Sequence, residues 1–143
     1  MNKFFCRLFA LLLSIVLITA AVPAAAASFA SLSQLQQYLE KHSPDNMLAT
    51  GPHYAELEGT IQEIHWCGAN NHYEMTLQVE DPKALAPTGS DVPLLTVHFR
   101  LHLDSVPFKV GDTVTVFGTV NELYSSVMIP WVLAKTINGS EDF

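Results

Sequence analysis

Between Tyr54 and Ile137, apolar and polar residues alternate with a period of two in five short runs that are separated by turn-forming residues. Such alternation is typical of strands that bury one face. We expect these strands at residues 55–66, 72–80, 94–103, 113–120 and 127–137. In the first run the apolar register slips between Ile61 and Ile64, which predicts a β-bulge that lets the strand curl. Because no helical run is long enough for a βαβ unit, the pattern predicts an all-β, five-stranded antiparallel barrel.

The fourth run and the turn before it form the most specific segment, Phe108-Lys-Val-Gly-Asp-Thr-Val-Thr-Val-Phe-Gly-Thr-Val120, which is followed at residues 130–137 by Pro-Trp-Val-Leu-Ala-Lys-Thr-Ile. Together these segments resemble OB-fold domains, in particular the small exported bacterial ones that are similar to tRNA-anticodon-binding-like OB modules. The resemblance spans residues 54–139 and concerns the fold rather than the function. Many OB folds carry a helix between the third and fourth strands, whereas residues 104–109 are too few for one. We therefore expect a helix from elsewhere in the chain to cap the barrel.

That helix is predicted before the first strand, where three leucines recur at helical spacing (Leu32, Leu35 and Leu39). Ser31 followed by Gln34 forms a capping box, and Pro44 stops the run. We expect a short amphipathic helix that docks on the barrel through its leucines. The chain then divides into a helix and linker at residues 28–53, an OB-fold domain at 54–139 and a flexible tail at 140–143.

Residues 1–27 have the organisation of a secretory signal peptide: a basic start, an apolar middle at residues 8–20 and an A-x-A pattern that ends at Ala27. We expect cleavage before Ser28 and an extracytoplasmic location, either secreted or in the cell envelope or periplasm. No membrane span is expected after cleavage. An uncleaved anchor is the alternative, because the apolar stretch is nearly long enough to cross a bilayer.

Cleavage would remove Lys3 and Arg7 and change the formal net charge from −7 to −9. A domain this acidic repels phosphate backbones and anionic membrane surfaces, so nucleic acid is not an expected partner. Cys67 would be the single remaining cysteine, so no intramolecular disulfide could form. It would be free, disulfide-linked between chains or metal-bound. We expect a monomer.

The usual ligand surface of an OB fold is the outside of its second and third strands, with the loops that join strands one to two and four to five. In this chain the resemblance places that surface on the Trp66–His72 loop, on two strand faces and on the loop at residues 121–126. The ligand-binding candidates are His72, His98, Arg100, His102 and Tyr124. All aromatic residues of the second and third strands are expected to face inward, so this surface should lack the stacking platforms of nucleic-acid-binding OB domains.

The pairing of the second and third strands follows from the rule that core-facing residues oppose core-facing residues. A loop centred near Pro87 pairs Glu74 with Arg100, Thr76 with His98 and His72 with His102. Registers shifted by two residues in either direction remain open. The simplest interpretation of this face is a solvated set of opposite charges, of little energetic value individually.

A second cluster surrounds the first predicted hairpin, Ile64-His-Trp-Cys-Gly-Ala-Asn-Asn-His72. With Ile64 and Trp66 facing the core, the neighbouring polar residues point outward at one end of the sheet. Imidazole and thiolate suit zinc or copper, and the metal-ligand candidates are His65, Cys67, His72 and His102. The alternative is that these residues merely flank a turn in which Asn70 or Asn71 adopts the left-handed conformation.

Function follows only in outline. The leading prediction is a non-catalytic exported OB-fold module that binds a small ligand, a peptide or another envelope protein, without a cofactor. A zinc or copper protein is the first alternative, and a single-stranded nucleic-acid-binding domain, disfavoured by charge, is the second. A purely structural module is a third. We expect no enzyme, because Cys67 has histidines nearby but no clear third group or oxyanion device.

Overall fold

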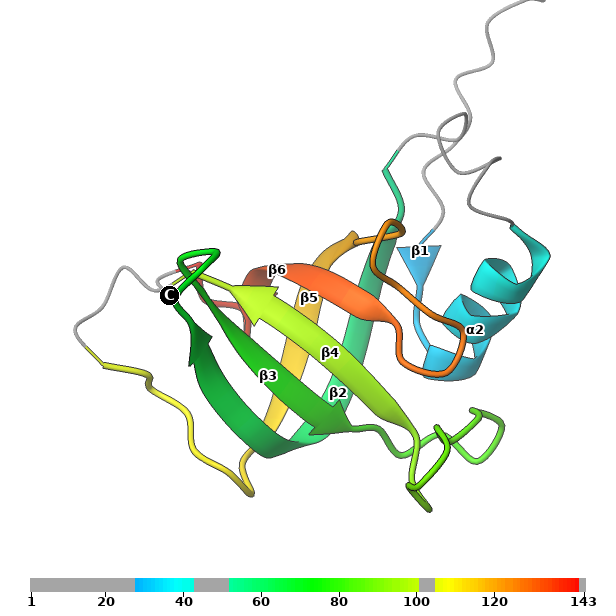
Figure 1. The fold of residues 1–143 in the computed structure, drawn as a ribbon, viewed down its shortest axis with the longest axis horizontal. Coiled ribbons are helices and arrows are strands. Elements are labelled where there is room, and N and C mark those ends of the chain that lie inside the picture. The colour runs from blue at the N-terminus through cyan, green and yellow to red at the C-terminus, as the bar shows by residue number, and fades with distance from the viewer. Residues whose placement is uncertain (1–27, 43–51, 101–104, 142–143) are drawn as a thin grey trace, which may run out of the picture.

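The computed structural model describes residues 28–42, 52–100 and 105–141 (Figure 1). The predicted signal peptide and His102 lie outside the described residues. The elements are β1 (Ser28–Phe29), α2 (Leu32–Lys41), β2 (Tyr54–Cys67), β3 (His72–Gln78), β4 (Leu94–Phe99), β5 (Thr113–Val120) and β6 (Trp131–Ile137). Within this part of the chain, no helix is long and apolar enough to cross a membrane.

Strands β2 to β6 close into a barrel in the order β2-β3-β4-β6-β5, and β5 pairs back with β2. This is the strand order of an OB-like fold, so the predicted fold class is confirmed. One detail of the prediction is wrong: β4 and β6 run parallel, whereas the other barrel pairs are antiparallel. The reason is parity. Directions cannot alternate all the way round a closed ring with an odd number of strands, so one pair must be parallel.

The ends of two strands differ from the prediction. The third strand, expected to reach residue 103, ends at Phe99, and the last strand begins at Trp131 rather than Val127. Pro130 has no N–H to donate to a strand ladder, so regular pairing starts directly after it. Within β5, Gly118 allows the close approach that the sequence predicted, because a Cβ there would collide with the Leu133 carbonyl group.

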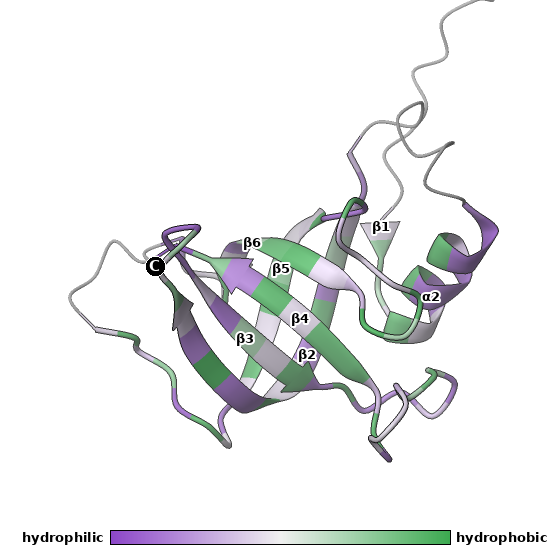
Figure 2. Ribbon diagram, viewed as in Figure 1, coloured by the Kyte–Doolittle hydropathy of each residue, from purple (hydrophilic) through white to green (hydrophobic). Residues whose placement is uncertain are grey.

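The predicted bulge in the first strand is confirmed, because the β2–β3 register shifts between Ile61 and Glu63. Along the strands, hydrophobic and hydrophilic residues alternate as the pattern requires (Figure 2). Inward-facing residues of the barrel join one core with the helix leucines: Leu32, Leu35, Leu39, Ala55, Leu57, Ile61, Met75, Leu77, Val79, Leu95, Val97, Phe99, Val114, Val116, Val120, Val132 and Ile137. The helix therefore docks on the barrel as expected.

Local contacts fix the start of α2. The Ser31 hydroxyl accepts a hydrogen bond from the Gln34 N–H at 3.3 Å, and the Gln34 side chain accepts one from the Ala30 N–H at 3.3 Å. The return bond of the predicted capping box thus reaches one residue further back than usual. The Asp81 carboxylate also accepts a bond from the Ser33 N–H at 2.8 Å, which ties the β3–β4 loop to the helix.

Candidate functional site

The register between β3 and β4 decides which polar side chains meet on the outside of the barrel. Glu74 lies opposite His98 and Thr76 opposite Thr96. The favoured pairing of Glu74 with Arg100 is therefore wrong, and one of the two registers shifted by two residues is correct. A backbone bond from the Val79 N–H to the Pro93 carbonyl, 3.0 Å long, closes the loop two residues earlier on this side than a loop centred on Pro87 requires.

A groove of about 640 Å³ crosses the outside of β3, β4 and β6, the last three strands of the ring apart from β5. The β2–β3 turn and the β5–β6 loop bound it. Its lining includes the predicted ligand-binding residues that the structure describes: His72, His98, Arg100 and Tyr124. His102, the fifth of that set, lies outside the described residues. The groove thus occupies the surface that the OB-fold resemblance implies.

A row of four stacked rings forms the floor of this groove. His72 stacks on His98 with ring centroids 4.3 Å apart, His98 contacts Trp131 at 4.4 Å, and Trp131 stacks on Tyr124 at 5.6 Å. The sequence prediction missed Trp131. The aromatic residues of β3 and β4 do pack on the inner side, where Tyr73 stacks on Phe99, but Trp131 comes from β6. Because Val132 is buried in the core, strand alternation places Trp131 on the outer face, so the signal was present.

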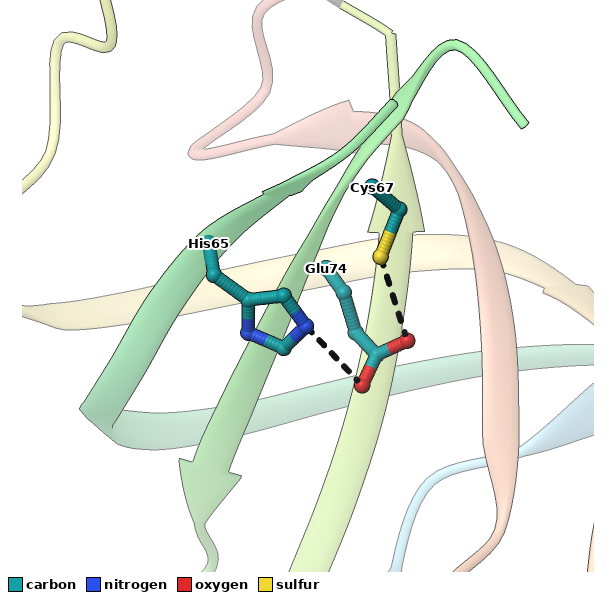
Figure 3. Close-up of side chains that lie close together, drawn as sticks. All are labelled: His65, Cys67 and Glu74. Carbon is teal, nitrogen blue, oxygen red and sulfur yellow. Dashed lines mark hydrogen bonds and ion pairs between the residues drawn. The ribbon is translucent and has the colours of Figure 1, made fainter. Parts of the chain in front are cut away.

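Glu74 is the polar centre of the outer face. Its Oε2 atom lies 3.1 Å from Nε2 of His98, and its Oε1 atom lies 3.7 Å from Nε2 of His65. The Cys67 thiol donates to Oε2 over 4.0 Å, a weak contact. Figure 3 shows His65 and Cys67 on either side of the Glu74 carboxylate. Sequence analysis assigned Glu74 only to a charge lattice, because its favoured register hid these neighbours.

Two buried nitrogen atoms in the groove lack hydrogen bonds. Among the described residues, Nε2 of His72 and Nε2 of His98 have no hydrogen-bond partner, since the 3.1 Å contact to Glu74 lacks hydrogen-bond geometry. Leaving a buried polar atom unpaired costs about 1–3 kcal/mol. Burial, and secondarily the nearby His72, lowers the pKa of His98 below its ordinary value, although Glu74 opposes the shift. His98 is therefore neutral at neutral pH.

The side chains around Glu74 form two possible metal-binding sets. His65, Cys67 and Glu74 form one, and His72, Glu74 and His98 form the other; in each, the donor atoms lie within 4.8 Å of one another. The predicted metal ligands are thus divided: His65 and Cys67 belong to the first set and His72 to the second. We call His72, Glu74 and His98 the groove cluster.

Trp66 does not point into the core as predicted. Its side chain is 50% exposed, although it shares the inner face of the sheet with Tyr73, whose ring centroid lies 4.9 Å away. The last residues of the β2–β3 hairpin extend past the core, so the inner face there meets solvent. The turn itself is as predicted, because Asn71 adopts the left-handed conformation with φ 53°.

A third polar cluster, which sequence analysis missed, lies where α2 meets the β5–β6 loop. Nδ1 of His53 lies 2.6 Å from Oε1 of Glu122, and the Tyr38 hydroxyl donates to the same oxygen at 3.1 Å. We call Tyr38, His53 and Glu122 the packed cluster. Since Glu122 precedes Tyr124 by two residues, this cluster fixes the loop that bounds the groove.

Charges of both signs line the groove. Arg100 and Lys135 supply cations, and Glu74 and Glu141 supply carboxylates. The surface therefore offers donors and acceptors together with apolar rings, rather than the uniformly positive channel that tracks a phosphate backbone.

No protein-family model matches the chain, and no curated protein matches it. Two solved structures are similar to it. The first is a lipoprotein of Klebsiella pneumoniae subsp. pneumoniae MGH 78578, described as nucleic acid-binding, with 19% identity, a TM-score of 0.48, and coverage of 77% of this chain and 89% of that one. The second is yeast Stn1 and Ten1, with 14% identity, a TM-score of 0.45, and coverage of 85% and 66% respectively. Likenesses this distant carry no functional argument, and the fold assignment rests on the strand order described above.

Proposed function

We propose that this OB-fold protein is a non-catalytic binding module that holds a short peptide segment of a partner protein in the groove across β3, β4 and β6. The observation that carries the proposal is the row of stacked rings with charges of both signs beside it. A peptide presents apolar side chains, amide donors and carbonyl acceptors together, and this lining complements all three. The groove volume also lies within the range of about 300–1,000 Å³ that is usual for ligand pockets.

The construction of the groove supports a binding role. Tyr124, 65% exposed, offers an accessible ring at one end of the row, while Trp131 and His98 are held by stacking within it. The packed cluster anchors the loop that carries Tyr124. A surface that is already ordered loses less conformational entropy when a ligand binds, which favours affinity.

Tryptophan fluorescence can test the proposal, because the chain has two tryptophans and only Trp131 lines the groove. Peptides would first be selected from a library of random eight-residue sequences and then titrated against Trp66→Phe, which leaves Trp131 as the reporter. We expect selected peptides to change the emission and to bind at least about tenfold more weakly to Trp131→Ala and Arg100→Ala, as for truncated interface anchors. Lys109→Ala, outside the groove lining, is the matched control. Peptides that bind all variants equally would contradict the proposal.

Single-stranded nucleic acid is the second candidate ligand. Trp131 and Tyr124 provide the outward aromatic rings that sequence analysis did not expect, and Arg100 and Lys135 lie in the same groove. The formal net charge of −7 opposes it. Titration of Trp66→Phe with oligothymidine at low salt separates the two candidates. Binding that weakens steeply with added salt favours nucleic acid, whereas salt-insensitive peptide binding favours the first proposal.

We further infer that the protein acts outside the cytoplasm, on the evidence of the basic start, apolar middle and A-x-A pattern of residues 1–27. Amino-terminal sequencing of protein recovered from cell-envelope fractions tests this inference. The expected first residue is Ser28. Recovery of the full chain from the cytoplasm would contradict it.

A further inference from the structure

The geometry points to a transition-metal site at the floor of the groove: we propose that His72, Glu74 and His98 bind one Zn²⁺ ion. The ion alone is the ligand, so the proposal does not depend on whether the groove holds a peptide. The two side chains of β3 and the one of β4 come from opposed positions of a paired sheet, a rigid support for a site.

The donor atoms are already close to the spacing that an ion requires. All three lie within 4.8 Å of one another, and Nε2 of His98 lies 3.1 Å from Oε2 of Glu74. Bonds of about 2.0–2.1 Å in a tetrahedral site place two donors roughly 3.3 Å apart. One pair therefore has the required separation, and small side-chain rotations of His72 would complete the set.

The second observation is the pair of unpaired nitrogens. Nε2 of His72 and Nε2 of His98 are both buried without a hydrogen-bond partner among the described residues. Buried imidazole nitrogens are ordinarily paired, so two such atoms beside one carboxylate call for a shared partner. A cation with a lone-pair donor on each side satisfies both nitrogens at once, whereas a further hydrogen-bond donor could satisfy only some of these atoms.

The donor set indicates the kind of ion. Two imidazoles and one carboxylate suit Zn²⁺, whereas Mg²⁺ and Ca²⁺ prefer all-oxygen sites. Three protein ligands leave a fourth coordination position. Because all three residues line the groove, that position opens into it, where a donor atom of a groove-bound molecule could occupy it.

The neighbouring set of His65, Cys67 and Glu74 is the competing location. Its histidine is more exposed, and its two nitrogens already face carboxylates, Glu63 at 3.8 Å and Glu74 at 3.7 Å. Nothing in that set is buried and unpaired. Because both sets use Glu74, the proposal assigns the ion to the groove cluster and leaves Cys67 outside its coordination shell.

Isothermal titration of the full-chain protein, purified without a histidine tag and treated with chelator, tests the site with ZnCl₂ as the probe and MgCl₂ as the control. We expect one Zn²⁺ per chain, a rise in Tm on adding Zn²⁺, and no response to Mg²⁺. Absence of Zn²⁺ binding would overturn the proposal.

Substitutions then locate the ion. Glu74→Gln, His98→Gln and His72→Gln preserve size and polarity, and each should weaken Zn²⁺ binding by more than about 100-fold, because even indirect supports of metal ligands are worth 10–100-fold. Circular dichroism of each variant checks folding, and His72→Gln, at a partly exposed position, guards against misfolding of His98→Gln. Cys67→Ser and His65→Gln are the matched controls and should bind within about threefold of the parent protein.

Co²⁺ substitution provides an independent readout. A site of two imidazoles and a carboxylate should give visible bands without the thiolate charge-transfer band in the near ultraviolet, identically in the parent protein and in Cys67→Ser. Loss of binding in Cys67→Ser together with full binding in His98→Gln would place the ion in the outer set and overturn the assignment to the groove cluster.

Discussion

The packed cluster and the groove cluster use the same chemistry to different ends. Each has a glutamate beside buried histidine, but in the packed cluster Glu122 accepts from the Tyr38 hydroxyl and lies 2.6 Å from His53. In the groove cluster two imidazole nitrogens remain unpaired. A satisfied buried network stabilises and orders the fold, whereas an unsatisfied one costs stability and marks a place where a ligand can contribute. The comparison assigns structure to one cluster and function to the other.

The largest effect should come from breaking the packed cluster. Glu122→Ala leaves the Tyr38 hydroxyl and His53 without their shared acceptor, so we expect the free energy of unfolding to fall by about 1–3 kcal/mol. Urea denaturation measures it. Glu122→Gln retains an acceptor and should lose less. An equal loss in both variants would show that packing of the side chain, rather than its hydrogen bonds, holds the loop.

A matched pair of histidine substitutions should show a smaller effect, opposite in sign between the two clusters. His98→Phe keeps a stacked ring on Trp131 and removes an unpaired nitrogen, so we expect stability unchanged or increased by up to about 1 kcal/mol. His53→Phe removes a paired nitrogen and should destabilise. Thermal and urea unfolding without added metal compare them, and similar losses in both would remove the distinction between the clusters.

Asp81 provides a weaker, exposed version of the satisfied cluster. Burial raises its pKa, but hydrogen bonds from Ser33 and Lys83 and the Lys83 charge outweigh burial and hold the pKa below its ordinary 3.8. The folded state therefore prefers the carboxylate. Its contribution is present above pH 3.8 and is lost as the pH falls through the lower folded value.

Asp81→Asn tests this sign. We expect the variant to be less stable than the parent at pH 7 by about 0.5 kcal/mol, with the difference shrinking below pH 4. Unfolding midpoints measured across this range give the result. A difference that grows in acid would mean that the folded state favours the protonated form.

The smallest effect is expected for Cys67→Ser. The thiol makes only a 4.0 Å contact to Glu74, so stability should stay within about 0.5 kcal/mol of the parent. Differential scanning calorimetry under reducing conditions measures it. A larger loss would show that the outer set around Glu74 contributes to the fold in the way that the packed cluster does.

Alternation and turn residues were sufficient to predict the barrel, the bulge after Ile61 and the capped helix, because each depends on neighbours in sequence. The register of β3 against β4 was not predictable to two residues, because a long loop separates the strands and either face of the sheet accepts both alignments. That uncertainty moved Glu74 away from His98 and concealed the groove cluster.

Other features could not be found from local sequence for a different reason. The packed cluster joins Tyr38, His53 and Glu122, which are far apart in the chain and meet only once the helix has docked. Trp66 alternates with the inner face as predicted, yet its exposure depends on where the barrel ends, which alternation does not encode. Trp131 was within reach of pattern analysis, because its neighbour Val132 is a core residue.

The odd number of strands in the ring also decides where a ligand would act mechanically. The single parallel seam joins Thr96, Val97 and His98 to Trp131, Val132 and Leu133, the shortest of the barrel joints, and parallel pairing is slightly weaker per residue. The row of rings lies across this joint, with His98 on one side and Trp131 on the other. An occupant of the groove would therefore act as a clasp over the seam, and slower amide exchange along β4 and β6 would record its closure.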